Sequence, residues 1–527
     1  MLDLFYPWHP MLTAAANVGI FGILCGAFVA SMAVSTCSPR TREILMADAP
    51  ILGLDKDHRE AAGRLLTSFF DDYERSIPDR PLVPVVDRDV LAGLLANPFP
   101  DKGLGVEGLF REINEKILPN STTVAHPRFL AYVLGPPNGI APYAEAIAAT
   151  INQNCNFWQL SPAASVVERA VITWLGGLFG YDERSGGILT GGGSIATLNA
   201  LTTALHAHLP GFREQGLQNS GPQLVVYTSA EAHRCVDKAA ALLGLGTDNV
   251  RHIPTDDHFR MRVDALEDAI RADRAAGREP FCVVATPGTV TSGSIDPIDA
   301  IADLCEREEL WLHLDGAYGA LFVLSERKRE AFAACARADS IALDPHKLLF
   351  TPLEAGCLLV RDRSLLAKAY AFSSSYLTVE EDPLMLDYMD YGPQLSRSFK
   401  ALKVWSALQA FGVDAFREAV DHTLDLAQYM ADLIKADPGL ELMTPVSLTA
   451  VCFRIKGASA ADHTAVLAEL IEEGTALLGP ACLDGRRGMR ACITNYRTTR
   501  DDIELIVDRL SEIARRRPAT DTPETFL

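Results

Sequence analysis

A glycine-rich segment, Thr190-Gly-Gly-Gly-Ser194, stands between an apolar run of strand length and a helix that we expect to begin near Ile195. Glycines let backbone N–H groups approach an anion closely, and the N-terminus of a helix favours negative charge. Ser194 can add a hydroxyl donor. The segment therefore predicts a phosphate cradle, although a tight turn without a ligand would fit it about equally well when it is considered alone.

Three ionisable side chains follow other apolar runs. Asp315 ends the run that starts at Trp311, where a buried carboxylate needs a cationic or hydrogen-bonding partner. Lys347 comes just after the next run, and an amine in such a place can form a Schiff base. His233 follows the run that ends near Tyr227. Each has an ordinary alternative: a helix N-cap for the aspartate, a solvated loop lysine and a core histidine.

The four features together match the needs of one cofactor. Ligands of parallel sheets lie beyond the carboxyl ends of the strands, so we expect the cradle and the three side chains at one sheet edge. Pyridoxal phosphate needs an anchor for its phosphate, an acid for its ring nitrogen, an amine for its aldehyde and a flat group over the ring. The sequence therefore predicts a pyridoxal-phosphate site.

From about residue 60 to about residue 512 the sequence resembles the group II pyridoxal-phosphate-dependent decarboxylases. This family includes aromatic-amino-acid, glutamate and diaminobutyrate decarboxylases. On the substrate side, the matching positions are His126-Pro-Arg-Phe129, Asn152-Gln-Asn154 and Ser161-Pro-Ala-Ala164 leading to Glu168. On the cofactor side they are Gly193 and Ser194 at the phosphate, His233 over the ring, Asp315 and Ala317 at the pyridine nitrogen, and His346 and Lys347 at the Schiff base. Further along the chain they are Ser375-Tyr376-Leu377 in the catalytic loop, Arg397 after that loop, and Arg490 with Thr494-Asn-Tyr-Arg-Thr498 at the C-terminal strand.

The resemblance implies a role for each catalytic residue. Lys347 would carry the cofactor, Asp315 would keep the pyridine nitrogen protonated, and His233 would stack on the ring. Tyr376 would close over the site on a mobile loop, residues 372–394, and return a proton to Cα after carbon dioxide leaves. The expected reaction is decarboxylation of an L-amino acid to its amine.

The substrate class is less sharply indicated than the reaction. Phe129, Trp158 and Tyr376 favour a flat or apolar side chain if they line the pocket, and His126 is expected beside them. Arg490 falls where glutamate-type members contact a carboxylate. We expect an aromatic substrate, with glutamate-like and diaminobutyrate-like substrates as alternatives.

The sequence also departs from the family pattern. Asp344 stands where aromatic decarboxylases usually carry Asn, Val290 replaces a frequent Thr, and Gly192 and Gly193 make the cradle richer in glycine than in the animal enzymes. These departures blur the substrate assignment and remove no group that decarboxylation needs.

Two further classes of function are weighed against a decarboxylase. A pyridoxal enzyme of different outcome could be an aldehyde synthase or an aminotransferase, but synthases replace the loop tyrosine with Phe, and here Tyr376 is present. A non-catalytic, membrane-tethered scaffold would have no need of Lys347, Asp315 and His233.

The elements that must position these residues follow from the hydrophobic pattern. From 187 to 361 short apolar runs alternate with helical stretches, one of which ends at Gly277, and this predicts a mostly parallel α/β sheet. A helical pattern that ends at Gly412 is followed by strand-like runs at 449–454 and 489–493, which indicate a smaller α+β domain. With the resemblance, the expected fold is pyridoxal-phosphate fold type I. The expected boundaries are 46–124 for an N-terminal helical segment, 125–394 for the large cofactor-binding domain, 395–514 for the small domain and 515–527 for a tail.

The composition limits the partners of the chain. Its 527 residues carry 48 basic and 68 acidic side chains, a formal charge of −20, which argues against general nucleic-acid binding. Its 11 cysteines contain no CxxC pair and no short metal-type spacing, so we expect reduced thiols, no metal site and a cytoplasmic location. The family resemblance implies a homodimer with the active site at the interface.

The first 45 residues differ from the rest. Residues 11–37 carry no charge and are long enough to span a bilayer as a helix. If they insert, Arg40 and Arg42 place the catalytic part on the cytoplasmic side. The alternative is that Met46 is the true start and the upstream stretch is an extension, so membrane contact is expected only if residues 11–37 insert.

Overall fold

The computed structural model describes residues 51–209, 211–218, 221–372 and 384–516. By their contacts the described residues fall into two units, one within residues 51–75 and 88–119 and the other within residues 76–87 and 120–516. Within the described residues no helix is both long and apolar enough to cross a membrane. The predicted apolar segment 11–37 lies outside the described residues.

The described part of the first unit is helical. None of the side chains of its helices α4 and α5 is buried, and Leu66, Leu91 and Leu95 are among the apolar side chains exposed there. The bounds are α4 (Lys56–Ser76), α5 (Arg88–Ala96) and α6 (Gly105–Glu112), the last continued by a π-helical turn (Ile113–Ile117).

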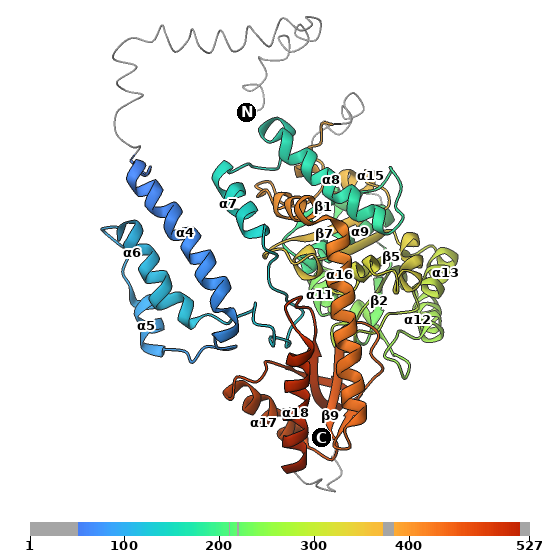
Figure 1. Ribbon diagram of the computed structural model, residues 1–527. Helices are drawn as coiled ribbons and strands as arrows, with labels where there is room; N and C mark the ends of the chain where they lie inside the picture. The colour runs from blue at the N-terminus through green and yellow to red at the C-terminus, as the bar shows by residue number, and fades with distance from the viewer. Residues whose placement is uncertain (1–50, 210, 219–220, 373–383, 517–527) are drawn as a thin grey trace, which may run out of the picture. The chain divides into compact units, whose positions relative to one another are not determined.

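The second unit is built on a seven-stranded sheet with the order β1-β7-β6-β5-β4-β2-β3 (Figure 1). Strands β3, β2, β4, β5 and β6 pair in parallel, and β7 runs antiparallel to both β6 and β1. Strands β1 to β6 therefore point the same way, which confirms the predicted mostly parallel sheet. The bounds are β1 (Gly186–Thr190), β2 (Leu224–Ser229), β3 (Val250–Ile253), β4 (Glu279–Ala285), β5 (Trp311–Asp315), β6 (Ser340–Leu343) and β7 (Gly356–Val360).

Helices cover the sheet and close a core around it. Every residue of β2, β6 and β7 is buried, as expected of apolar strands covered on both faces. Helix α9 packs along β7, β6, β5 and β4. It begins at Gly193, close to the end of β1 at Thr190, so its N-terminus lies at the sheet edge where β1 ends. The helices of this part are α7 (Ala141–Ile151), α8 (Pro162–Leu178), α9 (Gly193–His208), α10 (Phe212–Gln215), α11 (Cys235–Leu242), α12 (Val263–Ala275), α13 (Ile298–Glu308), α14 (Pro345–Leu348) and α15 (Ser364–Tyr370).

Short 3₁₀ segments connect several of these elements. They are Ile77–Asp79, Leu118–Asn120, Trp158–Leu160, Thr247–Asn249, Ala320–Leu324, Glu330–Arg337 and Tyr388–Asp390.

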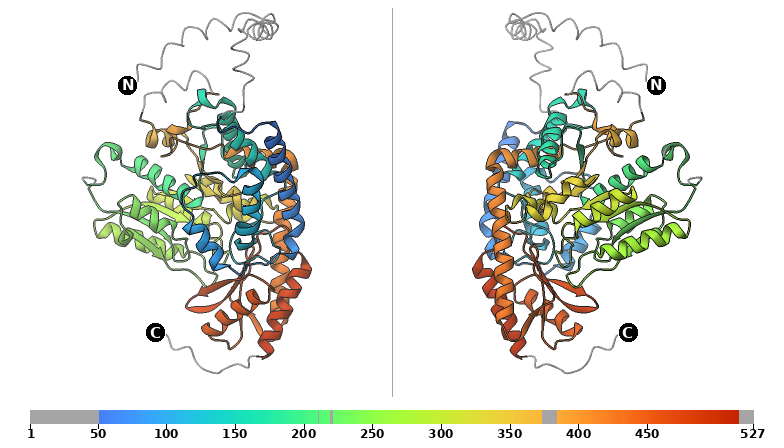
Figure 2. Two further views of the ribbon diagram at one scale, coloured as in Figure 1. Left: turned by 90° about the vertical axis from the view of Figure 1, so that its left-hand side faces the viewer. Right: turned by 90° about the vertical axis from the view of Figure 1, so that its right-hand side faces the viewer.

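A smaller antiparallel sheet, with the order β10-β11-β9-β8, forms the C-terminal part. It lies with α17 and α18 at one end of this unit, and the long helix α16, drawn in orange, runs from the large sheet to it (Figure 2). The predicted helix end at Gly412 is a break within α16, where φ is +72° and ψ is 162°, and the helix resumes beyond it. The bounds are α16 (Ala401–Ala436), β8 (Leu440–Leu442), β9 (Ala450–Ile455), α17 (Ala460–Glu472), β10 (Gly479–Leu483), β11 (Arg486–Cys492) and α18 (Arg500–Arg516).

Candidate active site

Strand direction brings the predicted segments to one edge of the large sheet. β1 ends at Thr190, β5 at Asp315 and β6 at Leu343, and all three point the same way. The antiparallel strand β7 begins at this edge, where Gly356 pairs with Thr190 and Cys357 with Leu343. The cradle, the aspartate and the lysine therefore lie around neighbouring strand ends.

Close contacts favour glycine at two positions of the cradle, and the backbone conformation favours it at the third. A Cβ on Gly191 would lie 2.8 Å from Oε2 of Glu354, and one on Gly193 would lie 2.6 Å from Cβ of Ala317. Gly192 has φ +127°, a conformation that side chains disfavour. Gly193 begins α9, and the exposed Ser194 follows it, so backbone N–H groups at a helix N-terminus are open to close approach. This is the geometry that a phosphate group needs.

The amine of Lys347 faces this cradle through an ion pair. Its Nζ lies 3.0 Å from Oδ2 of Asp344, and the same oxygen lies 3.2 Å from the Cβ position of Gly193. Oδ1 of Asp344 is buried and accepts no hydrogen bond from the described residues. The neighbouring His346 is buried beside Gly192, and this burial lowers its pKa. The lysine is thus held near the phosphate position by a carboxylate.

Asp315 presents a buried carboxylate that no cation neutralises among the described residues. Its Oδ2 accepts a hydrogen bond from Sγ of Cys235 at 3.3 Å, and its Oδ1 accepts one from the backbone N–H of Ala317 at 3.4 Å. A ring nitrogen of the exposed His233 lies within 4.8 Å of both Cys235 Sγ and an oxygen of Asp315. A buried carboxylate without a cation suits a protonated ring nitrogen, which would supply the missing charge.

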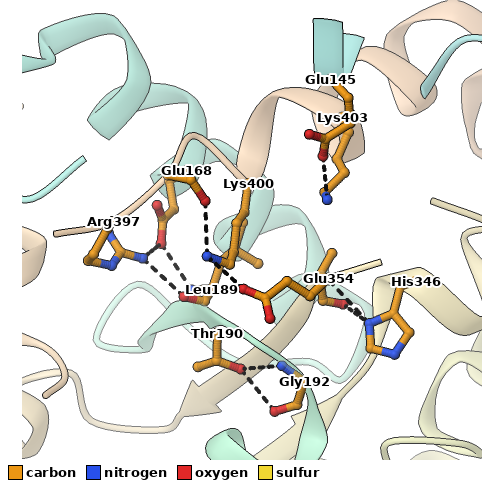
Figure 3. Close-up of polar contacts among 12 residues, drawn as sticks. Glu145, Glu168, Leu189, Thr190, Gly192, His346, Glu354, Arg397, Lys400 and Lys403 are labelled. Carbon is orange, nitrogen blue, oxygen red and sulfur yellow. Dashed lines mark hydrogen bonds and ion pairs between the residues drawn. The ribbon is translucent and has the colours of Figure 1, made fainter. Parts of the chain in front are cut away.

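A buried ion pair fixes the strand that leads into the cradle. Nη2 of Arg397 lies 2.5 Å from Oε1 of Glu168, and the same oxygen accepts a hydrogen bond from the N–H of Leu189 at 2.9 Å. Arg397 also donates to the carbonyl oxygen of Leu189 (Figure 3). A further hydrogen bond from Arg397 goes to the carbonyl oxygen of Cys155. Both ion-pair residues match the family pattern in the sequence, but the sequence does not show that they pair. In the structure they meet at Leu189, the residue before the cradle.

Two buried lysines near the cradle were missed by the sequence analysis. Lys400 pairs with Glu354 at 3.2 Å, and Lys403 pairs with Glu145 (Figure 3). Glu354 is the side chain that closes against Gly191, so Lys400 lies next to the cradle. The available signal was their spacing of three residues at the start of an apolar helix, which places them on one face.

Two of the residues expected on the substrate side, His126 and Phe129, lie beside the C-terminal part of the chain, and the third, Trp158, lies next to α8. The buried His126 is joined to the C-terminal strand region, because its carbonyl accepts a hydrogen bond from Nδ2 of Asn495 at 2.9 Å. Phe129 packs in a buried cluster with Leu82 and Leu477. Trp158 is half-buried, and its indole N–H is buried with no partner among the described residues.

Arg490 is a buried cation without a carboxylate partner in the described part of the chain. Its guanidinium donates to the carbonyl oxygens of Val290 at 2.8 Å and Ala131 at 3.0 Å. Its Nε is buried and has no partner there. Tyr376, with the segment Ser375–Leu377, lies outside the described residues.

The donor set fits pyridoxal phosphate. The glycine cradle, which leaves no room for a Cβ, suits the phosphate of that cofactor. The amine beside the cradle suits the aldehyde, and the buried carboxylate without a counter-ion suits the ring nitrogen.

Comparisons with known proteins agree with this fit. Residues 89–456 match the family model described as the pyridoxal-dependent decarboxylase conserved domain. An aromatic-L-amino-acid decarboxylase of Bacillus atrophaeus is 33% identical over 472 residues, which cover 88% of this chain and 97% of that protein. An L-2,4-diaminobutyrate decarboxylase of Rhizobium meliloti (strain 1021) is 33% identical over 489 residues, 91% of this chain and 96% of that protein.

Solved structures give the same result. The crystal structure of Oryza sativa TDC with PLP and tryptamine superposes with a TM-score of 0.82 at 26% identity, and the match covers 89% of this chain and 99% of that chain. The family match spans well over half of the residues, and both relatives match along nearly their whole length. The chain belongs to the pyridoxal-dependent decarboxylase family, whose members are carboxy-lyases that act on amino acids with pyridoxal phosphate.

Proposed function

We propose that this chain removes the α-carboxyl group of an L-amino acid with an aromatic side chain, giving the amine and carbon dioxide. The observation that carries the proposal is the meeting of the glycine cradle, Lys347 and Asp315 at one sheet edge. Pyridoxal phosphate supplies the electron sink that accepts the electron pair left at Cα. The residues of the chain hold the reactants and move the protons.

Each of the four catalytic residues has a distinct task in this proposal. Lys347 binds the aldehyde carbon through Nζ, close to the cradle that holds the phosphate. Asp315 keeps a proton on the ring nitrogen, because its buried carboxylate has no other cation among the described residues. His233 lies against the ring, and Tyr376 delivers a proton from its phenol to Cα.

The preference for an aromatic substrate rests on two supports. The relatives include an aromatic-L-amino-acid decarboxylase, and a structural neighbour holds tryptamine. Phe129 and Trp158 supply aromatic surface in the segments expected near the substrate, although Phe129 is itself buried in a cluster with Leu82 and Leu477.

One observation favours a second candidate, a substrate with an acidic side chain. Arg490 is buried with no carboxylate partner among the described residues, and its Nε is left without a hydrogen-bond partner. A buried guanidinium that lacks a counter-ion suits a bound carboxylate. The same arginine would not suit the ammonium side chain of a diaminobutyrate-like substrate.

The experiment that tests the proposal is a screen of single L-amino acids for carbon dioxide release by the purified, cofactor-loaded protein. Amino acids with aromatic, acidic and amine side chains are compared at equal concentration, with a Lys347→Ala variant as the blank. Release from an aromatic acid at least tenfold faster than from the others supports the proposal. Carbon dioxide release from acidic amino acids alone would replace the aromatic substrate with the second candidate. Release from no amino acid would reject both candidates.

We further propose that the chain works as a homodimer with its active site at the interface, in the cytoplasm. The exposed apolar side chains of α4 and α5, which include Leu66, Leu91 and Leu95, support the dimer, because exposed apolar faces of this kind are typical of protein interfaces. Sedimentation of the full-length protein tests it, and a monomer at micromolar concentration that retains full activity would reject it.

A further inference from the structure

Behind the ring-nitrogen aspartate, a row of polar side chains runs through the buried interior away from the site. Asp315 accepts the hydrogen of the Cys235 thiol, whose sulfur lies 3.9 Å from the hydroxyl of Thr197. That hydroxyl lies 3.5 Å from Nε2 of His313. We name the whole row the Asp315 chain, and its members in order are Trp311, Ser340, His313, Thr197, Cys235 and Asp315.

The two ends of the Asp315 chain favour one direction for the hydrogen bonds between them. The indole of Trp311 can only donate, and it donates to the hydroxyl oxygen of Ser340 at 2.9 Å. Ser340 then has one hydrogen to give, and Nδ1 of His313 lies 2.9 Å away. At the other end an ionised carboxylate can only accept. With Ser340 as the donor to Nδ1 of His313, the hydrogens all point toward Asp315.

The chemistry of the middle members agrees with this direction. Burial lowers the pKa of His313 to about 4, so the ring is neutral near pH 7 and has one accepting and one donating nitrogen. Burial, with the nearby Asp315 carboxylate, raises the pKa of the Cys235 thiol, which keeps its hydrogen. The thiol of Cys235 has one hydrogen, and it donates this hydrogen to the carboxylate of Asp315. In the longer contact between Thr197 and Cys235, the Thr197 hydroxyl is therefore the donor and the sulfur is the acceptor.

We propose that the Asp315 chain holds this carboxylate aimed at the ring nitrogen, and that Cys235, Thr197 and His313 are positioning residues for the cofactor. Aligned hydrogen bonds polarise one another in a medium of low dielectric, so each one strengthens the next. All three of these residues are buried, so water cannot replace a missing link. The inference rests on the proposed role of Asp315.

The test compares cofactor binding by variants of the full-length protein. Thr197→Val keeps the shape of the side chain and removes the hydroxyl that joins the two halves of the chain. Thr197→Ser restores that hydroxyl. Thr203→Val is the matched control, because Thr203 is equally buried on the same helix and its hydroxyl bonds instead to the carbonyl of Asn199.

Cofactor-free protein is titrated with pyridoxal phosphate, and the visible absorbance of the bound cofactor gives both its dissociation constant and its band position. We expect Thr197→Val to raise the dissociation constant about tenfold, as for the loss of one hydrogen bond in a charged network. Its band should shift, because the band senses protonation of the ring nitrogen. Thr197→Ser should stay within about twofold of the wild type, as should Thr203→Val, since neither breaks the chain.

A second pair of variants separates positioning from packing. Cys235→Ser keeps a donor toward Asp315, whereas Cys235→Ala removes it. The first should bind cofactor like the wild type and the second should resemble Thr197→Val. Equal constants and equal bands for Thr197→Val and Thr203→Val, or no rescue by either Ser variant, would overturn the Asp315 chain. Wild-type protein that binds no cofactor would instead overturn the proposed role of Asp315.

Discussion

Glu168 and Arg397 stand 229 residues apart in the sequence and form an ion pair in which both side chains are buried. Glu168 lies on α8, and Arg397 lies between the 3₁₀ segment Tyr388–Asp390 and α16. Both bind backbone atoms of Leu189, so the pair joins three distant segments at the strand that leads into the cradle.

We predict that Glu168→Leu lowers the free energy of unfolding by about 3–5 kcal/mol, because it leaves the Arg397 guanidinium buried without its partner. The double variant Glu168→Leu, Arg397→Met should lose less than the single variant, since no unpaired charge remains. Urea unfolding of the wild type, the two single variants and the double variant measures this difference. A double variant that is as unstable as the sum of two single variants would show that the two side chains do not interact energetically.

We predict that Lys347→Ala abolishes covalent attachment of the cofactor while the chain still folds. The amine of Lys347 is the one held at the cradle by Asp344, whereas Lys403 pairs with Glu145. Borohydride reduction followed by peptide mass analysis should locate the cofactor on Lys347, and Lys403→Met should keep it there. Finding the cofactor on any other lysine would contradict the assignment.

The buried His313 predicts a specific dependence of stability on pH. Its pKa is about 4 in the folded chain, below the usual value of 6.5, because burial disfavours the charged ring. Between these values the unfolded chain binds a proton that the folded chain does not, so this contribution to stability is present above pH 6.5 and is lost as the pH falls toward 4. Urea unfolding at pH 7 and pH 5 should show a smaller loss for His313→Gln than for the wild type. Equal losses would mean that another group causes the effect.

We predict that Arg490→Gln raises KM for substrate at least tenfold and changes kcat less, if its guanidinium binds a substrate carboxylate. Arg487→Gln is the control, since Arg487 lies on the same strand β11 and is exposed. Initial rates over a range of substrate concentrations separate the two constants. An unchanged KM would leave Arg490 as a structural residue that holds Val290 and Ala131.

We predict that Tyr376→Phe diverts the reaction from the amine toward the aldehyde, with oxygen consumed and ammonia released. Phe keeps the aromatic ring and removes the phenol that would protonate Cα. The ratio of amine to aldehyde, followed together with oxygen uptake, measures the change. An unchanged ratio at an unchanged rate would mean that the proton comes from another group, most simply His233.

The sequence allowed the strand ends of this site to be predicted, because each is a local pattern. Asp315 and Lys347 follow apolar runs directly, and parallel strands must end at the same edge. Pairings across strands could not be predicted in this way. His313 and Ser340 meet only because β5 and β6 pair in a particular register, and register depends on the whole sheet.

The direction in which side chains point also could not be predicted from the sequence. Lys400 and Glu354 carry no motif, and their meeting beside the cradle depends on how α16 approaches β7. The break at Gly412 was found from the helical pattern, but the continuation of α16 to Ala436 was not, since a glycine with positive φ usually ends a helix.

The antiparallel strand β7 links the two segments that we propose hold the cofactor. Its consecutive residues Gly356 and Cys357 pair with Thr190 before the phosphate cradle and with Leu343 before the lysine segment. A slip of one residue on one side alone would displace one segment from the other by about 3.3 Å, roughly two covalent bonds. The spacing between the proposed phosphate and aldehyde positions therefore depends on the register of a strand that contributes no proposed catalytic side chain.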